Sequence, residues 1–201
     1  MEKTVPKGWS VKDLGDIAKF SGGSAFKEIY QGLSSGTHPF IKVSDMNLIG
    51  NERYIKKSNN WISEEIKNQE NIRLFPPNSV IFAKVGAALL LNRRRLLVRE
   101  TAIDNNMMAA IPYNCEPEFL FYLMQTIDLG KIVLDGAVPS VNQDQMKTIT
   151  VNIPPLPEQK KIISTLKSID ITIEKIHSKI RKLKDLKISV MNNLMTKGLN
   201  H

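Results

Sequence analysis

A heptad pattern of aliphatic residues near the carboxyl end constrains the fold of this chain more than any other feature. From residue 162 onward the apolar positions are spaced alternately by four and three residues, which is the periodicity of a coiled-coil helix. The pattern predicts one helix from Pro157 to Met195, about 58 Å long at about 1.5 Å per residue. Its seam has one charged position, Lys187. The other predicted seam residues are Ile162, Leu166, Ile169, Ile173, Ile176, Ile180, Leu183, Val190 and Leu194.

A helix of this length needs a partner for its apolar seam. A globule formed by residues 1–155 would be only about 30 Å across, too small to cover the whole seam. We therefore expect the seam to pair with another helix. The alternative is that the seam packs on the globular part of its own chain.

The segment Ile153-Pro154-Pro155-Leu156-Pro157 separates the helix from the rest of the chain. Pro157 suits the first helical position, where its missing N–H is no loss, and Glu158 favours the positive helix start. Gly198 is suited to end the helix. We place the domain boundary here, with a globular domain at 1–155 and a helical segment at 156–201.

Residues 1–155 have the pattern of a mixed α/β (α+β) globule. Apolar runs at 40–44, 79–83 and 107–111 are typical of strands. Ser63 precedes a short helix as its cap, and residues 116–127 have the pattern of a longer amphipathic helix. Turn sequences separate these elements: Ser21-Gly22-Gly23-Ser24, Ser34-Ser35-Gly36, Pro76-Pro77-Asn78 and Gly136-Ala137-Val138-Pro139.

Charge and cysteine content bear on partner and compartment. The net charge is +8, and from Leu156 onward ten Lys/Arg stand against four Asp/Glu. A basic surplus favours a polyanionic partner, although a solvated helix face explains it equally well. The single cysteine, Cys115, permits no internal disulfide and fits a reducing compartment, by default the cytoplasm. No apolar stretch reaches the roughly 20 residues of a membrane span.

The sequence carries no catalytic signature that we recognise. It has no glycine-rich loop followed by Lys-Ser/Thr, and no Asn-Pro-Pro-aromatic tetrapeptide of amino-methyltransferases. The histidines His38, His177 and His201 are not in metal-ligand spacing. We therefore expect no catalytic residue, no metal site and no cofactor on this chain.

A basic cluster at Asn92-Arg93-Arg94-Arg95 indicates contact with DNA instead. Arginine forks pair with phosphates and with guanine edges, and Asn and Gln can pair with adenine. A short basic run is also a common solvated surface, so the region is better supported than any of its members. The predicted DNA-contacting residues are Lys27, Lys56, Lys57, Lys84, Arg93, Arg94, Arg95, Arg99, Asn142 and Gln143.

Several segments, taken in order, resemble one half-unit of the specificity subunit of type I restriction-modification systems. The most specific is Ile153-Pro154-Pro155-Leu156-Pro157-Glu158-Gln159-Lys160-Lys161-Ile162, which leads into the long helix. The others are Pro6-Lys7-Gly8-Trp9, Leu14-Gly15-Asp16-Ile17, residues 39–46, residues 79–86 and Leu194-Met195-Thr196-Lys197-Gly198-Leu199.

The resemblance implies a target-recognition domain followed by one helix of a coiled-coil spacer. Members of the family usually hold two such units, whose helices pair antiparallel, whereas this sequence holds one. It further implies a non-catalytic role in DNA recognition, in a homodimer through antiparallel helices. Its implied partners are methyltransferase subunits that bind S-adenosylmethionine, and a restriction subunit. Three other hypotheses stay open: a stand-alone dimeric DNA-binding regulator, a single-chain methyltransferase or nuclease, and a coiled-coil scaffold.

Overall fold

The computed structural model describes residues 5–133 and 138–199. The chain divides into two compact units, a globular unit of residues 1–159 and a helical unit of residues 160–201, and each is described by itself. Gly136 and Ala137 of one predicted turn, and His201, lie outside the described residues. In the part that is described, no helix is both long and apolar enough to cross a membrane.

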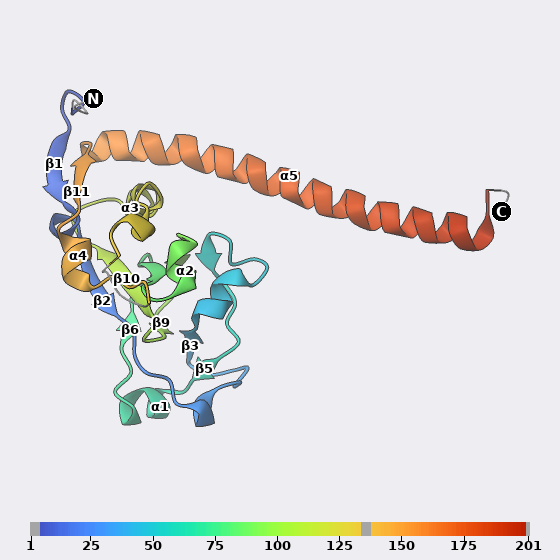
Figure 1. The fold of residues 1–201 in the computed structure, drawn as a ribbon, viewed down its shortest axis with the longest axis horizontal. Coiled ribbons are helices and arrows are strands. Elements are labelled where there is room, and N and C mark those ends of the chain that lie inside the picture. Colours follow the sequence, from blue (N-terminus) through green and yellow to red (C-terminus); the bar gives the residue numbers. More distant parts are fainter. Residues whose placement is uncertain (1–4, 134–137, 200–201) are drawn as a thin grey trace. The chain divides into compact units, whose positions relative to one another are not determined.

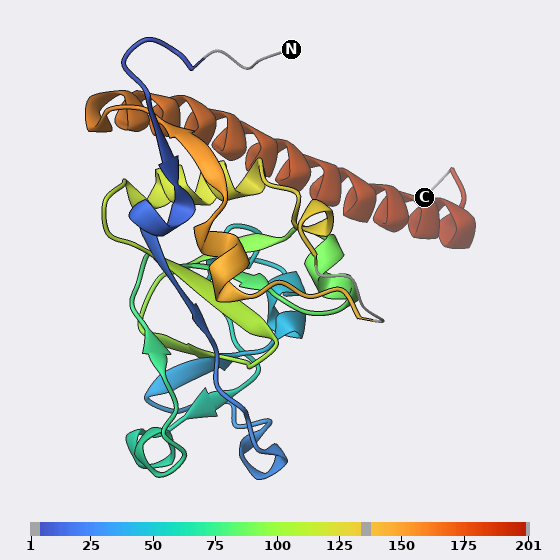
Figure 2. The same cartoon turned by 60° about the vertical axis from the view of Figure 1, so that its left-hand side comes forward.

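Two sheets form the body of the globular unit (Figures 1 and 2). The larger sheet has the order β2-β10-β7-β8-β4 and the smaller the order β5-β3-β9-β6. The β3–β9 and β4–β8 pairs are parallel, and the other pairs are antiparallel. The strands of the larger sheet are β2 (Ala18–Gly22), β4 (Tyr54–Ile55), β7 (Val80–Ala83), β8 (Arg94–Leu97) and β10 (Met107–Pro112). Those of the smaller sheet are β3 (His38–Ile41), β5 (Trp61–Ile62), β6 (Leu74–Phe75) and β9 (Thr101–Ile103).

The main hydrophobic core lies between these sheets. Ile41 and Ile103 reach it from the smaller sheet, and Ile81 and Met107 reach it from the larger one. All four side chains are fully buried. Because both sheets contribute to one cluster, loops that leave either sheet are carried on a single rigid body. The fold class predicted from the sequence, a mixed α/β globule followed by a long helix, is confirmed.

Short helices connect the strands. The α-helices of the globular unit are α1 (Glu64–Gln69), α2 (Ala87–Leu90), α3 (Pro117–Gln125) and α4 (Gln143–Lys147). The 3-10 helices are η1 (Leu14–Asp16), η2 (Glu28–Tyr30), η3 (Val43–Asn47) and η4 (Leu129–Lys131).

The predicted strand at 40–44 ends earlier than its apolar pattern indicates. β3 stops at Ile41, and the chain turns at once into η3. The cause is Asp45, whose carboxylate accepts a hydrogen bond from the backbone N–H of Lys42 at 2.8 Å. The predicted strands at 79–83 and 107–111 are confirmed as β7 and β10, and the helix predicted at 116–127 is the shorter α3.

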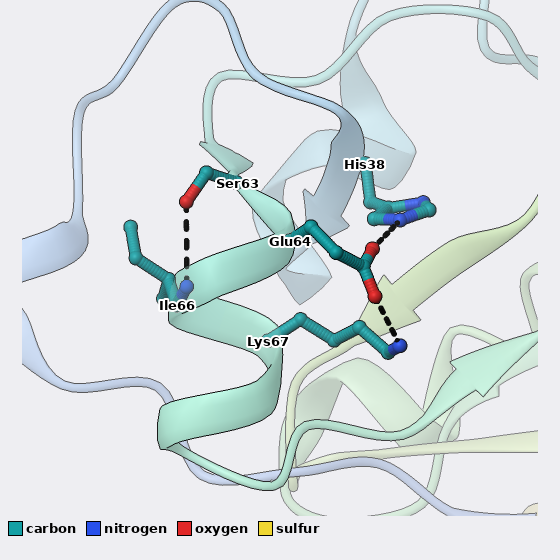
Figure 3. A network of polar contacts seen from close by, with 5 residues as sticks. All are labelled: His38, Ser63, Glu64, Ile66 and Lys67. Carbon is teal, nitrogen blue, oxygen red and sulfur yellow. Dashed lines mark hydrogen bonds and ion pairs between the residues drawn. The ribbon is translucent and has the colours of Figure 1, made fainter.

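The capped helix predicted after Ser63 is confirmed as α1, which is fastened to β3 (Figure 3). Ser63 Oγ accepts a hydrogen bond from the backbone N–H of Ile66 at 3.3 Å. Glu64 then bridges two side chains: its Oε2 lies 2.9 Å from Nε2 of His38, and its Oε1 lies 2.6 Å from Nζ of Lys67. His38 therefore has a structural role in positioning α1.

The two ends of the globular unit are held together by β1 (Ser10–Asp13) and β11 (Thr150–Ile153), which pair antiparallel (Figure 2). Gln159, at the end of this unit, is 2% exposed. Its Oε1 accepts a hydrogen bond from the backbone N–H of Glu116 at 2.9 Å, and its Nε2 donates to the carbonyl of Pro154 at 3.0 Å. The first turn of the long helix is thereby part of the globular unit.

The long helix α5 (Leu156–Lys197) runs unbroken, so every predicted seam residue lies on one helix. It ends where the sequence predicts, since Gly198 has a φ of +74° and its N–H donates to the carbonyl of Leu194 at 3.0 Å. In the helical unit, Ile169 and Ile176 are each 50% exposed and Ile173 is 44% exposed. From Ile169 to Leu194 the seam residues are exposed, with Lys187 as the one charged position, whereas Ile162 and Leu166 are half-buried.

Candidate nucleic-acid interface

The three consecutive arginines do not form one basic surface. Arg93 is exposed, Arg95 is half-buried and Arg94 is 2% exposed. The guanidinium of Arg94 donates to the carbonyl of Ile127 at 2.7 Å and to Oδ1 of Asn92 at 3.0 Å. Arg94 is therefore a structural residue in this fold, and we correct the expectation that it contacts DNA.

Arg94 remains a cation despite its burial. Removal from water lowers its pKa to about 10, against which the nearby carboxylate of Asp128 acts weakly. Asn92 Nδ2 donates to that carboxylate at 2.8 Å, and Asn92 Oδ1 also accepts from the backbone N–H of Leu129 at 2.8 Å. Together Asn92 and Arg94 tie the start of β8 to the chain around η4.

Arg93 and Arg95 both reach back to η3. Arg93 Nη1 donates to Oδ1 of Asn47, and Arg95 Nη2 donates to the carbonyl of Met46 at 3.0 Å. Partial burial, followed by the neighbouring charge of Arg93, lowers the pKa of Arg95. Both guanidinium groups are therefore positioned beside η3.

Asn51 attaches a second basic pair to the same helix. Its Nδ2 donates to the carbonyls of Asp45 and Lys57, each at 2.8 Å. Its Oδ1 accepts from the backbone N–H groups of Lys56 at 2.9 Å and Lys57 at 3.0 Å. Both lysines are exposed. The structure thus gathers four of the predicted residues around η3: the η3 basic group is Lys56, Lys57, Arg93 and Arg95.

A second group forms where β7 ends. The backbone N–H of Val141 donates to the carbonyl of Lys84 at 3.0 Å, which places Asn142 and Gln143 beside Lys84. Asn142 caps α4, since its Oδ1 accepts from the backbone N–H of Gln145 at 2.9 Å. That bond takes one of the two lone pairs of the amide oxygen and holds the Asn142 side chain at the helix start, whereas the exposed side chain of Gln143 makes no such cap. The β7 polar group is Lys84, Asn142 and Gln143.

The remaining two predicted residues contact other elements. Lys27, whose side chain is 61% exposed, pairs with Glu70 at 2.7 Å, and the hydrogen bond to Glu70 raises the pKa of Lys27. The guanidinium carbon of Arg99 lies 6.0 Å from the ring centre of Trp61. The printed sequence gives no sign of either pairing, because the partners lie 43 and 38 residues away in the chain.

Sequence reasoning missed the buried polar residues that brace these loops. Asn51 and Asp45 are both 0% exposed. Burial raises the pKa of Asp45, against the opposing effect of hydrogen bonds from Lys42 and Asn59. Isolated Asn and Asp residues are common in loops, so nothing local to the sequence distinguishes these two. Across residues 5–133 and 138–199, no group of three or more His, Cys, Asp or Glu side chains could hold a metal ion.

Residues 6–185 match the family model described as the type I restriction modification DNA specificity domain, and the chain belongs to this family. It is similar to the specificity subunit of the type I restriction enzyme MjaIX from Methanocaldococcus jannaschii, with 25% identity over 97% of this chain and 45% of that protein. It is also similar to the EcoR124I/EcoR124II specificity subunit from Escherichia coli, with 24% identity over 79% of this chain and 40% of that protein. The chain thus spans less than half the length of these relatives.

Solved structures show the same fold. A chain of a type I R-M system, solved to explain complex assembly and conformational transition, superposes with a TM-score of 0.72 at 14% identity, over 98% of this chain and 48% of that one. The HsdS subunit of Thermoanaerobacter tengcongensis gives a TM-score of 0.64 at 14% identity, over 98% of this chain and 47% of that one.

Proposed function

We propose that this chain recognises a DNA half-site as the specificity component of a type I restriction-modification complex and catalyses no reaction itself. The observation that carries the proposal is the family match, which extends over the globular unit and most of α5. The positions of the basic side chains support it. Lys56, Lys57 and Arg93 are exposed on loops that a buried polar framework holds in place.

Contacts to phosphates and contacts to bases have different roles in this proposal. The exposed cations of the η3 basic group bind phosphates and set the register of the globular unit on the duplex. Gln143 and Lys84 of the β7 polar group are the side chains we assign to base edges. Arg94 has no part in either role, since its guanidinium is inside the domain.

The α5 helix supplies the spacing between two recognition units. In our proposal it pairs antiparallel with α5 of a second copy, through the predicted seam, to give a twofold dimer. The support is the row of exposed aliphatic side chains from Ile169 to Leu194, which only Lys187 interrupts. Twofold symmetry then requires inverted half-sites, separated by about one turn of DNA, roughly 34–36 Å, or slightly more.

In this proposal the partner subunits catalyse the reactions. We infer that methyltransferase subunits bind S-adenosylmethionine, flip the target adenine out of the duplex and methylate it. A restriction subunit is the further partner, and the compartment is the cytoplasm, where the DNA is. Membership of the family supports this assignment of roles.

Co-expression of the chain with methyltransferase subunits tests the proposal. We expect a stable complex, and methylated adenines within one bipartite sequence when the host genome is mapped. A host that carries the methyltransferase subunits without this chain is the control, and it should lack those modified sites. Selective DNA binding by the chain without any association with the methyltransferase would instead support a stand-alone regulator. Failure of the assembled complex to bind DNA would contradict the proposal.

A further inference from the structure

A polar depression of about 350 Å³ lies at the end of β2, and no residue of the η3 basic group or the β7 polar group lines it. It is lined by Gly22, Gly23, Ser24, Asn71, Ile72 and Arg73. The segments that form it are distant in sequence, since one follows β2 and the other precedes β6. The depression is therefore a product of the tertiary fold.

Gly23 fixes the shape of the depression. Its N–H donates to the carbonyl of Met107 at 3.1 Å, and the next N–H, of Ser24, donates to the carbonyl of Ile103 at 2.9 Å. A Cβ at residue 23 would lie 2.2 Å from the carbonyl oxygens of both Ile103 and Asp104, a distance that real Cβ atoms do not show. Only glycine lets the chain approach β9 this closely, and this approach places the Ser24 hydroxyl.

Arg73 is the cation of the depression. Its backbone N–H donates to Ser24 Oγ at 3.0 Å, and its Nη1 donates to Ser21 Oγ. Ser24 lines the depression and accepts from Arg73, so its own O–H can donate to a ligand. Ser21 is 5% exposed and lies outside the lining, so its hydroxyl positions the guanidinium. Within the described ranges no carboxylate lies within ion-pair distance of Arg73, whose side chain is exposed.

Lys84, directly after β7, adds a second positive charge beside Gly22. Its Nζ lies 3.3 Å from the position that a Cβ of Gly22 would take. β2 and β7 finish at the same end of the larger sheet, because both pair antiparallel with β10 and Gly22 and Phe82 both pair with Met108. The carboxylate of Asp104 accepts from the backbone N–H of Asn106 at 2.7 Å, and this residue is 8% exposed. Hydroxyl donors and cations therefore dominate the surface around the depression.

We propose that Arg73, positioned by Ser21 and assisted by the hydroxyl of Ser24, binds one phosphate of the DNA backbone. A guanidinium beside a hydroxyl donor matches a phosphate, which accepts hydrogen bonds through its oxygens and carries negative charge. The inference rests on the proposed DNA-binding function and adds a contact outside the residues already assigned. Since a phosphate is present at every step of the duplex, the contact strengthens binding to any sequence equally.

The test measures DNA affinity of the full chain over a series of salt concentrations, for a target duplex and an unrelated duplex. Arg73→Gln keeps the backbone hydrogen bond to Ser24 and a side-chain donor but removes the charge. We expect affinity to fall roughly tenfold. The slope of log affinity against log salt should become shallower by about one. The fold-loss should be equal on both duplexes, and Arg73→Lys should keep the wild-type slope.

Lys19→Gln is the matched control. Lys19 is an exposed cation on β2, the strand that also carries Ser21, and it lies outside the depression. It should leave both affinity and slope unchanged. Thermal unfolding of each variant separates a lost contact from a lost fold. An Arg73→Gln variant that folds normally and keeps the wild-type slope would overturn the inference.

Two further outcomes show which proposal has failed, the DNA-binding function or the DNA phosphate site. If the wild-type chain binds neither duplex, the proposed function fails before the phosphate site is in question. If inorganic phosphate raises the melting temperature of the wild-type chain but not of Arg73→Gln, while the DNA slope is the same for both, the site binds a free oxyanion. That result would also overturn the assignment to DNA.

Discussion

Asn51 holds Lys57 by two hydrogen bonds of opposite direction. Nδ2 of Asn51 donates to the Lys57 carbonyl at 2.8 Å, and the Lys57 N–H donates to Oδ1 of Asn51 at 3.0 Å. The amide side chain thus replaces a strand partner for this loop. Because Asn51 also donates to the carbonyl of Asp45, the loop that carries Lys56 and Lys57 cannot move without disturbing η3.

Asn51→Ala should therefore impair both stability and DNA binding. The substitution removes the printed partners of three backbone groups, the Lys57 carbonyl and the N–H groups of Lys56 and Lys57, while the Asp45 carbonyl keeps the N–H of Leu48. We expect the free energy of unfolding to fall by about 3 kcal/mol. DNA affinity should fall as well, because Lys56 and Lys57 lose their fixed position. Urea unfolding and DNA titration measure the two effects. Asn105→Ala, at an exposed site, is the control and should change neither quantity. Unchanged stability of Asn51→Ala would contradict the bracing role.

Arg94→Ala should lower stability and Arg93→Ala should change DNA binding, although the two residues are adjacent. Arg94→Ala leaves the Ile127 carbonyl without its guanidinium donor and opens a cavity, so we expect a loss of about 3 kcal/mol in the free energy of unfolding. Arg93→Ala should change stability by less than about 0.5 kcal/mol but make the salt dependence of DNA binding shallower by about one. Calorimetry and DNA titration distinguish the two variants. Equal effects of both variants on DNA affinity would contradict the assignment.

Gly23→Ala and Gly22→Ala form a similar pair. A Cβ at residue 23 meets backbone oxygens at 2.2 Å, and we expect the unfolding free energy to drop by more than about 3 kcal/mol. A Cβ at residue 22 meets only the flexible end of Lys84 at 3.3 Å, so the fold should tolerate it. Melting temperatures compare the two variants. A stable Gly23→Ala protein would show that the close approach to β9 is dispensable.

Charges in the seam should disrupt the proposed dimer. A chain with Asp at Ile169, Ile173 and Ile176 should sediment as a monomer, because three carboxylates would be buried in the helix pair. Ile171→Asp is the control: this residue is also exposed on α5 but lies on the side away from the seam, and its dimer should persist. Sedimentation equilibrium gives both masses. A wild-type chain that is itself monomeric at all accessible concentrations would exclude pairing between two copies.

Cys115 should react slowly in the folded chain. Burial raises the pKa of its thiol from an ordinary 9.0 to about 12. At pH 8 the thiolate fraction is then about 1,000-fold below that of a free cysteine, and alkylation should slow accordingly. The raised pKa contributes stability that is complete below pH 9 and is lost as the pH rises toward 12. Alkylation rates in buffer and in denaturant measure the effect, and equal rates would contradict the burial of this thiol.

Periodic features of the fold are predictable from the sequence, because they repeat within one segment. The seam of α5, its end at Gly198 and the cap at Ser63 all follow from patterns a few residues long. The end of β3 at Ile41 does not, since it depends on the carboxylate of Asp45, which folds back onto Lys42. The strand order also lacks a local signal, because β3–β9 and β4–β8 pair across long stretches of chain.

In the candidate site, too, local patterns are predictable from the sequence and contacts between distant residues are not. Clustering of arginine led to the prediction for the region around residue 93, but Arg94 is buried while Arg93 is exposed and Arg95 is half-buried, and sequence could not tell which arginine points inward. The groups that decide this are Ile127 and Asn92, of which one is a backbone carbonyl 33 residues away. Arg73 escaped notice because its neighbours in sequence are ordinary loop residues. Its environment arises only when residues 21–24 fold against it.

The pairing of β1 with β11 means that the chain enters and leaves the globular unit one strand spacing apart. Loops elsewhere in the unit, such as the segment between β2 and β3, can lengthen or shorten without moving that exit point. Loop variation can therefore change the surface of the globular unit while its connection to α5 stays constant. The same geometry would allow the whole globular unit to be exchanged for another through two junctions that lie side by side.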